Sequence, residues 1–423
     1  MVPVLTKRTV VQFVLLIAAY WAAAPSDASD FAIVAATIYP SPDSDPISNG
    51  IVVIHDGHIT AVGKATDVAV PRDARRLAAP GGAIMAGFWN SHVHILTHDL
   101  LHADGRSSAE LSAHLEEMFT RWGFTTVFDL ASVLDNTNVI RRRIESGDVH
   151  GPNILTVGEP FYPPNGTPIY IKQFLADEHL DSPEVTSIPQ AVERERDEIK
   201  RGADAVKLFT GAIVGGTIGV LPMPLPMIQA LTNEAHAQHK QVFAHPSNVA
   251  GLNAAIDGGV DILAHTAPMA GPWNAEMIAR LLQHHMALIP TLTLFEVEAR
   301  KFGESPQDEA SDIATAVGQL RAFALAHGEI LFGTDVGYTD AYDTAEEFAL
   351  MHRAGLDVRA ILASLTTTPA SRFGFSRHKG RVAPGMDADL VVLQSDPAVE
   401  ITAFSRVLFT IRAGQVTYRS DGR

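Results

Sequence analysis

The central part of the sequence, residues 85–377, alternates short apolar runs with longer helical stretches eight times. Such alternation predicts βα units and a parallel sheet. Eight pairs favour an α/β fold of the (β/α)8 TIM barrel type, in which functional residues lie at the carboxyl ends of the strands. An open doubly wound sheet is the alternative. The expected strands are 88–94, 125–129, 153–157, 205–209, 241–245, 262–265, 287–290 and 330–334, and the expected helices are 107–122, 133–145, 189–201, 226–239, 249–257, 274–285, 311–327 and 343–354.

The segments on either side of this region have the pattern of short strands and turns. In residues 29–84, two apolar runs flank Asp56-Gly57, a strong hairpin signal. Residues 378–423 contain three further short apolar runs separated by turns. Each segment is too small to bury a core alone, so we expect the two to meet as one small β-sandwich domain.

The first 28 residues have the layout of a secretory signal peptide. Lys7 and Arg8 precede an apolar run, Val10 to Ala24, and small residues then suit cleavage after Ala28. A single membrane anchor is the competing interpretation, but the run is shorter than the ~20 apolar residues that span a bilayer. We therefore expect a secreted or periplasmic protein that has no membrane association after cleavage.

Composition limits the kinds of partner and metal ligand. The formal net charge of −16 disfavours nucleic acid and anionic membrane surfaces as partners. The chain has no cysteine, so a bound metal would need histidine and carboxylate ligands. These features fit an enzyme that acts on a small-molecule substrate, and they do not decide whether the chain forms a homo-oligomer.

Polar side chains of metal-binding type end several of the expected strands. His92 and His94 in "GFWNSHVHI" lie on one face of the first strand because alternate residues share a face. The fifth and sixth strands end at His245 and His265, and the eighth ends at Asp335. Each residue alone could cap a helix or bond a loop. In a barrel, however, all five would converge at the mouth.

Lys207 lies inside the expected fourth strand, "DAVKLFTG". A buried ammonium group has a heavy desolvation penalty, so the side chain needs a partner or must lose its proton. A neutral lysine amine can add carbon dioxide to become a carbamate, which is a carboxylate on a long arm. Such a group could bridge two cations.

Together these residues resemble the metal-dependent amidohydrolase superfamily, in its prolidase-like, ochratoxinase-like and imidazolonepropionase-like branch. The resemblance also includes the late "GTD" and the closing "GRVAPGMDADLVVL". It implies two divalent metal ions, usually Zn2+, with Lys207 as N6-carboxylysine between them. His92, His94 and Asp335 would surround the more buried ion, and His245 and His265 would bind the other. Two departures are Asn90, where many relatives have Asp, and "FTGAIVGG" after the lysine.

The resemblance implies an exported amidohydrolase that cleaves an amide bond of a small substrate, such as a dipeptide or an N-acyl amino acid. A metal-bridging hydroxide would attack the carbonyl, with Asp335 as general acid and base. Hydrolysis of a cyclic amide or lactone, or deamination, is an alternative on the same metals. A non-catalytic periplasmic binding protein is another. The segments 159–188 and 294–311 are interpreted as long loops that could form a lid over the site.

Overall fold

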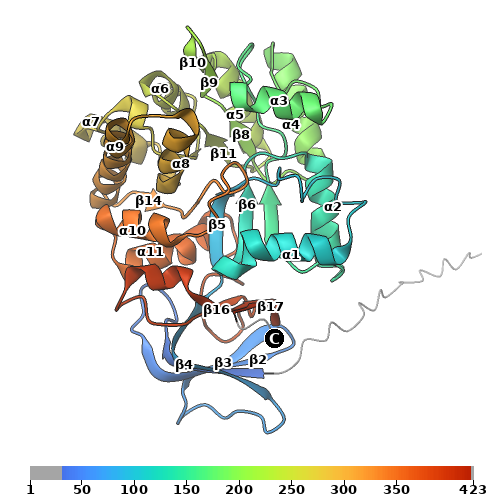
Figure 1. Cartoon of the computed structure of the whole chain (residues 1–423), viewed down its shortest axis with the longest axis vertical. Coiled ribbons are helices and arrows are strands. Elements are labelled where there is room, and N and C mark those ends of the chain that lie inside the picture. The colour runs from blue at the N-terminus through green and yellow to red at the C-terminus, as the bar shows by residue number, and fades with distance from the viewer. Residues whose placement is uncertain (1–30, 421–423) are drawn as a thin grey trace, which may run out of the picture.

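The computed structural model describes residues 31–420, so the expected signal peptide lies outside the described residues. Within this range, no helix is both long enough and apolar enough to cross a membrane. Figure 1 shows two regions, a small sheet at one end and a larger helical region around short strands at the other.

The small sheet joins the two ends of the chain. Its seven strands follow the order β17-β16-β15-β4-β1-β2-β3, and β1 and β4 are its parallel pair. The N-terminal and C-terminal segments therefore pair with each other, as expected. Their strands form one continuous hydrogen-bonded sheet, and the hydrogen bonds do not divide it into the two sheets of a sandwich. Its strands are β1 (Phe31–Ile38), β2 (Ile47–His55), β3 (His58–Lys64), β4 (Arg75–Ala86), β15 (Leu390–Leu393), β16 (Val407–Arg412) and β17 (Gln415–Arg419).

The larger region contains two parallel sheets. The first has three strands in the order β5-β6-β7, and the second has five in the order β14-β13-β12-β11-β8. These eight strands match the eight expected ones in position, although several are shorter. Their bounds are β5 (Phe88–Val93), β6 (Phe124–Asp129), β7 (Asn153–Thr156), β8 (Val206–Leu208), β11 (Val242–Ala244), β12 (Ile262–Leu263), β13 (Ala287–Leu288) and β14 (Glu329–Ile330).

Backbone hydrogen bonds connect the two parallel sheets at both margins. On one side Ser91 N donates to Phe332 O at 2.7 Å, and Asp335 N donates to His92 O at 2.9 Å. On the other side Phe161 N donates to Lys207 O at 2.8 Å. The strand ends of both sheets are consequently fixed relative to one another, including the residues that follow β5, β8 and β14.

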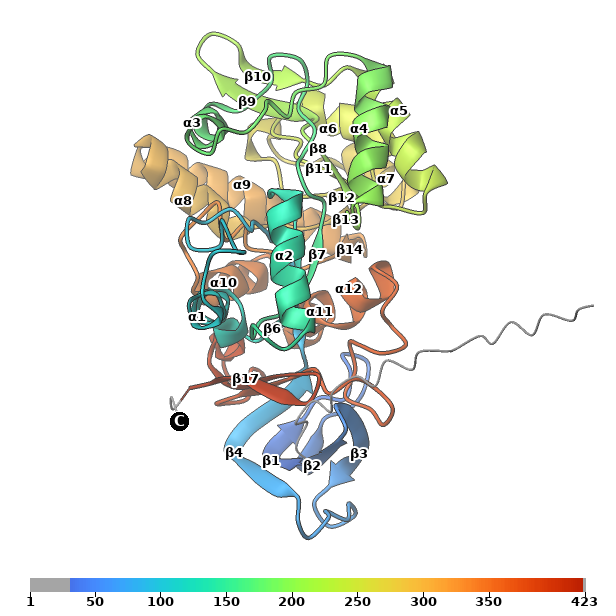
Figure 2. The ribbon, with the colours of Figure 1, turned by 90° about the vertical axis from the view of Figure 1, so that its right-hand side faces the viewer.

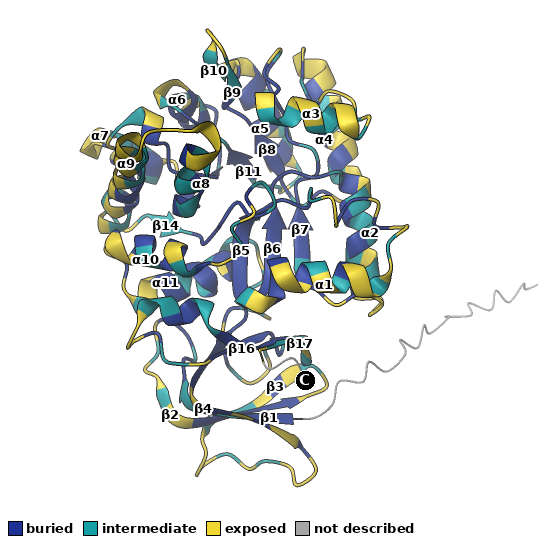
Figure 3. Ribbon diagram, viewed as in Figure 1, coloured by how far each residue is buried: buried dark blue, intermediate teal, exposed yellow. Residues whose placement is uncertain are grey.

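Helices pack outside these strands, with their exposed faces toward solvent (Figures 2 and 3). Apolar residues from both sheets form one buried cluster, in which Trp89 stacks on Phe373 with ring centroids 5.8 Å apart. The helices are α1 (Ser108–Met118), α2 (Leu134–Glu145), α3 (Ile169–Asp177), α4 (Ile188–Lys200), α5 (Leu225–Ala237), α6 (Val249–Asp257), α7 (Ala275–Gln283), α8 (Leu292–Phe302), α9 (Pro306–Leu325), α10 (Ala345–Arg353), α11 (Val358–Leu365) and α12 (Thr367–Arg372).

The prediction of a long loop at 294–311 is wrong. This segment forms α8 and the start of α9, separated at Gly303, which has a φ of 68°. Ser305 caps α9 by accepting a hydrogen bond from Asp308 N, and Pro306 occupies the first turn, where its missing N–H is not needed. The aromatic and charged residues of this segment thus belong to helices rather than to a loop.

Five other elements were not expected. The segment 159–188 contains α3, the hairpin of β9 (Gly211–Gly215) and β10 (Gly219–Pro222) follows β8, and α11 and α12 follow α10. The hairpin has glycines at its turn with positive φ, which is the conformation that glycine adopts without strain.

Candidate metal centre

All six residues singled out in the sequence line a single cavity of about 230 Å³. They come from both parallel sheets: His92 and His94 end β5, Lys207 lies in β8, and the other three follow β11, β12 and β14. The convergence expected from the strand pattern is therefore present in the structure. Several of these side chains are also in close contact. His265 lies between two other histidines, with its ring centroid 4.5 Å from that of His92 and 4.6 Å from that of His245.

Hydrogen bonds at the outer ring nitrogens fix how two of the histidines are oriented. His92 Nδ1 lies 2.8 Å from Ala264 O, and His94 Nδ1 lies 3.3 Å from Ala131 O. A carbonyl oxygen only accepts, so in both rings Nδ1 donates a proton. Nε2 is then the ring nitrogen that each histidine presents to the cavity.

Asp335 Oδ1 faces Nε2 of both rings. It lies 2.9 Å from His92 Nε2 and 2.7 Å from His94 Nε2, and His92 Nε2 has no hydrogen-bond partner among the described residues. Burial lowers the pKa of His92 to about 4, so this ring is neutral at pH 7 and has no proton for the carboxylate. The buried acceptors therefore lack a positive charge between them, which a cation would supply.

A set of three such ligand atoms satisfies the distance requirement for one ion. His92, His265 and Asp335 each offer an atom, and these atoms lie within 4.8 Å of one another. Burial would raise the pKa of Asp335, but the His92 and His94 rings outweigh this effect and hold it well below its usual range. The carboxylate is consequently charged and available to a metal ion.

Lys207 is buried beside this group, with 1% of its surface exposed. No hydrogen bond or ion pair of its Nζ is found among residues 31–420, and Nζ lies 5.6 Å from the Phe209 ring centroid. Burial lowers its pKa from 10.5 to about 7, against a smaller opposing effect of Asp335. A substantial fraction of the side chain is therefore a neutral amine near neutral pH.

His245 completes the set on the side of β8. Its ring stacks on Phe209 with centroids 4.7 Å apart and an interplanar angle of 21°. Burial, followed by the charge of Lys207, lowers its pKa to about 3. The imidazole is therefore neutral at pH 7, as a metal ligand must be.

Thr291 orients His265 and was not singled out in the sequence. Its hydroxyl donates to Pro290 O at 2.9 Å and lies 2.7 Å from His265 Nδ1, from which it accepts. Thr291 has a φ of 45°, a strained conformation for a β-branched residue. Glu347 of α10 stabilises this turn by accepting hydrogen bonds from the backbone N–H groups of Leu292 and Thr293, at 2.9 and 2.7 Å.

Asp129, at the end of β6, was also missed. It is fully buried and accepts hydrogen bonds from Ile95 N at 3.1 Å, from Thr156 Oγ1 at 2.6 Å and from the Ser132 hydroxyl. These bonds fix the loop whose Ala131 carbonyl accepts from His94. Its position at a strand end is the sequence signal that could have identified it.

The cavity lining combines aromatic and charged side chains. Tyr162, Phe174 and Phe209 contribute aromatic surface, and Glu298 and Lys301 of α8 contribute charged groups. A second cavity of about 390 Å³ shares the apolar part of this wall, including Leu96 and Phe174.

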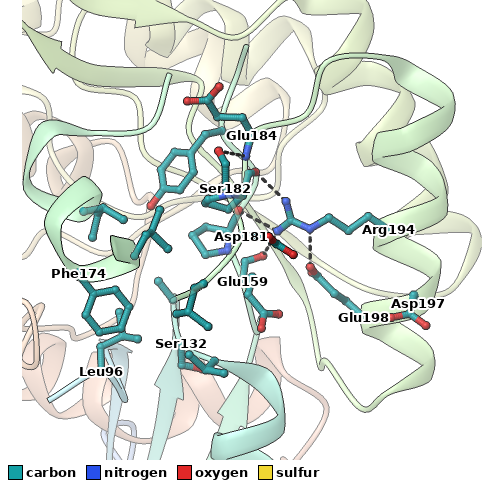
Figure 4. A pocket seen from close by; sticks show the side chains of 18 of the residues that line it. Leu96, Ser132, Glu159, Phe174, Asp181, Ser182, Glu184, Arg194, Asp197 and Glu198 are labelled. Atoms are coloured by element: carbon teal, nitrogen blue, oxygen red, sulfur yellow. Dashed lines mark hydrogen bonds and ion pairs between the residues drawn. The ribbon is translucent and has the colours of Figure 1, made fainter. Parts of the chain in front are cut away.

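In the second cavity, shown in Figure 4, Arg194 donates to Glu198 Oε1 at 2.7 Å and to the carbonyl oxygens of Pro183 and Glu159. Its guanidinium is thus fully engaged in the protein. Although this cavity is the larger one, none of the six converging residues lines it.

Known proteins resemble this chain over most of its length. A sequence model described as "Amidohydrolase family" matches residues 83–417. Ochratoxinase of Aspergillus niger is 25% identical over 421 residues, covering 90% of this chain and 85% of the relative.

Solved structures extend the resemblance to the fold. A Xaa-Pro dipeptidase with bound methionine in its active site has a TM-score of 0.78 and 21% identity, covering 93% of this chain and 100% of its own. Molinate hydrolase has a TM-score of 0.72 and 21% identity, covering 92% and 94%. At these identities the likeness concerns the fold.

The buried amine gives a prediction about stability. Between about pH 7 and pH 10.5 the unfolded chain keeps the Lys207 proton that the folded chain has lost, so the stability of the metal-free protein rises with pH in this window. We expect Lys207→Met to be more stable than the parent at pH 7. This advantage should shrink as the pH rises toward 10, by at most about 1.4 kcal/mol per unit. Thermal unfolding of the chelator-treated parent and variant at several pH values measures the stability difference and its change with pH. Equal stability of the two proteins at pH 7 would contradict the prediction.

Proposed function

The chain belongs to the amidohydrolase family, a family of metal-dependent hydrolases that act on C–N bonds, and from this premise we propose its substrate and its metal content. We propose that it cleaves an amide bond of a small substrate, such as a dipeptide or an N-acyl amino acid, using two divalent metal ions. The observation that carries the proposal is the convergence of Asp335 Oδ1 with Nε2 of His92 and of His94 in one buried cavity, where His92 Nε2 has no hydrogen-bond partner among the described residues. The relatives named above, an ochratoxinase and a Xaa-Pro dipeptidase, support an amide substrate.

We propose that the converging residues hold two ions, although His92, His265 and Asp335 are the three whose ligand atoms lie within 4.8 Å of one another. His92, His94 and Asp335 would hold one, and His245 and His265 would hold the other, with Zn2+ favoured by a ligand set rich in imidazole. Lys207 would complete the set as N6-carboxylysine. Its burial among neutral histidines and its lowered pKa support this, because carbamate formation requires the neutral amine.

The reaction assigns separate roles to the metals and to the protein. When bound, the ions lower the pKa of a water molecule and polarise the carbonyl of the bond to be cleaved. Asp335 accepts the proton of the attacking water and returns it to the nitrogen as the C–N bond breaks, so that an acid and an amine are released. Thr291 and the Ala264 carbonyl hold His265 and His92 in the required orientations.

We propose that the two parallel sheets form one (β/α)8 barrel and that the sheet at the chain ends folds into a sandwich. Backbone hydrogen bonds at both margins of the parallel sheets support the first, as do the structural relatives. A buried cluster from both ends of the chain, including Ile33 and Leu390, supports the second. The proposed bounds are 29–84 and 378–423 for the sandwich and 85–377 for the barrel. Export to a periplasm or medium, with cleavage after Ala28, is part of the same proposal.

Metal dependence is the direct test. We expect hydrolysis in a screen of dipeptides and N-acyl amino acids, complete loss after chelation, and recovery with about two equivalents of Zn2+ in the presence of bicarbonate. Recovery should be poorer below pH 7, where Lys207 is protonated and does not form a carbamate. Metal analysis measures how many ions are bound, and amine release measures hydrolysis. Unchanged turnover in the chelated protein would refute a metal mechanism, and cleavage restricted to cyclic amides or lactones would refute the linear substrate.

Asp335→Asn tests the acid and base role with the backbone preserved. Asp335 has a φ of 62°, a left-handed conformation that Asn tolerates better than most other residues with a side chain. We expect the variant to fold and to lose at least about 100-fold in kcat, because a proton carrier contributes roughly 10²–10⁴-fold. Circular dichroism checks the fold, and near-parental kcat would show that another group carries the proton.

Thr291 offers a matched pair of variants. Thr291→Val keeps the shape but removes the hydroxyl, so we expect a roughly 10- to 100-fold loss of metal affinity. Thr291→Ser keeps the hydroxyl and the acceptor for His265, and its affinity should stay near that of the parent. Competition with a chromogenic chelator measures both. Equal affinities of the two variants would mean that the hydroxyl does not orient His265.

A further inference from the structure

Glu298 is a charged group of the cavity that the proposed reaction does not use. It lies on α8 and lines the same cavity as His92, Lys207 and Asp335. Leu294, Glu298 and Lys301 are spaced by four and three residues, which places all three on one face of the helix, and all three line the cavity. The position of Glu298 is thus set by a regular helix rather than by a mobile loop.

The carboxyl group of Glu298 has little compensation from the protein. It is partly buried, and its hydrogen-bond partner is the Tyr338 hydroxyl, which donates to Oε1 at the long distance of 3.3 Å. No ion pair of Glu298 is found in the described part of the chain. The nearby cation, Lys301, lies over the Tyr338 ring at 4.3 Å from its centroid. An unpaired carboxylate of this kind is costly unless a ligand supplies the positive charge.

The surroundings limit what that ligand can be. Burial, followed by the charge of Asp335, raises the pKa of Glu298 to about 7, so a cation in the cavity would favour its charged form. The lining also includes Tyr162, Phe174 and Phe209, which offer apolar surface. A ligand with a positive group near an amide and an apolar side chain matches this lining.

We propose that Glu298 binds the free α-ammonium group of the substrate, so that this enzyme acts on unblocked dipeptides rather than on N-acyl amino acids. The inference rests on the proposed amide hydrolysis and selects between its two substrate classes. In an unblocked dipeptide the ammonium group is attached to the carbon next to the scissile carbonyl. A carboxylate on the wall of the metal cavity is therefore placed to recognise it, whereas an acylated nitrogen has no charge to offer.

The test compares an unblocked dipeptide of apolar residues with its N-acetyl derivative, using the metal-loaded full chain. For the parent we expect a clear preference for the unblocked dipeptide. Glu298→Gln, which keeps the shape, should lower kcat/KM for that substrate by roughly 10- to 100-fold, the range expected for a lost hydrogen bond to a charged group. Its kcat/KM for the N-acetyl derivative should change by less than about threefold, and its metal content should be unchanged.

Glu296→Gln is the matched control. Glu296 lies on the same helix and pairs with Arg300, but it does not line the cavity. We expect the control to keep the parental preference. Three results would overturn the inference: a parent that prefers the N-acetyl derivative, an equal loss on both substrates in Glu298→Gln, or a loss of metal in that variant. If the parent hydrolyses neither substrate nor any other amide, the proposed function itself has failed, which is a distinct result.

Discussion

The site depends on one electrostatic constraint, the approach of two buried acceptors that lack a proton between them. His92 uses Nδ1–H on the Ala264 carbonyl, so its Nε2 faces Asp335 Oδ1 at 2.9 Å. In a buried site two acceptors repel one another unless a cation lies between them. The lowered pKa of His92 excludes the simplest alternative, a proton on that ring. The arrangement is therefore unfavourable by itself, and the surrounding structure must maintain it.

Two polar networks behind the site provide that support. Asp129 accepts hydrogen bonds from the loops after β5 and β6, and Glu347 accepts them from the first turn of α8. Both carboxylates are buried and have several donors, as buried charges require. They fix the Ala131 carbonyl and the strained Thr291, so the histidines are oriented by backbone and hydroxyl groups that are themselves held in place.

The sequence predicted the residues that line the site better than the residues that hold them in place. The six converging residues could be identified because each ends or interrupts an apolar strand, and strand ends of a parallel sheet meet at one edge. Asp129 also ends a strand, but a single Asp before a helix has the same pattern as an ordinary cap. Thr291 and Glu347 had no periodic signal, since their roles come from contacts over 26 and 54 or 55 positions. The segment 294–311 was misjudged because its charged and aromatic residues resemble those of a loop, and Glu298 was missed with it.

The small sheet also helps to position the residues of the site. A single residue, Gly87, separates β4 from β5, and Gly87 N donates to Asp389 O at 2.8 Å. Next to this point Ala86 pairs with Leu390 of β15, so the C-terminal segment fixes the register of the chain just before it enters β5. A slip of one residue along β5 would turn His92 to the opposite face of the strand. The two ends of the chain, although distant from the cavity, therefore decide which face of β5 presents its histidines to it.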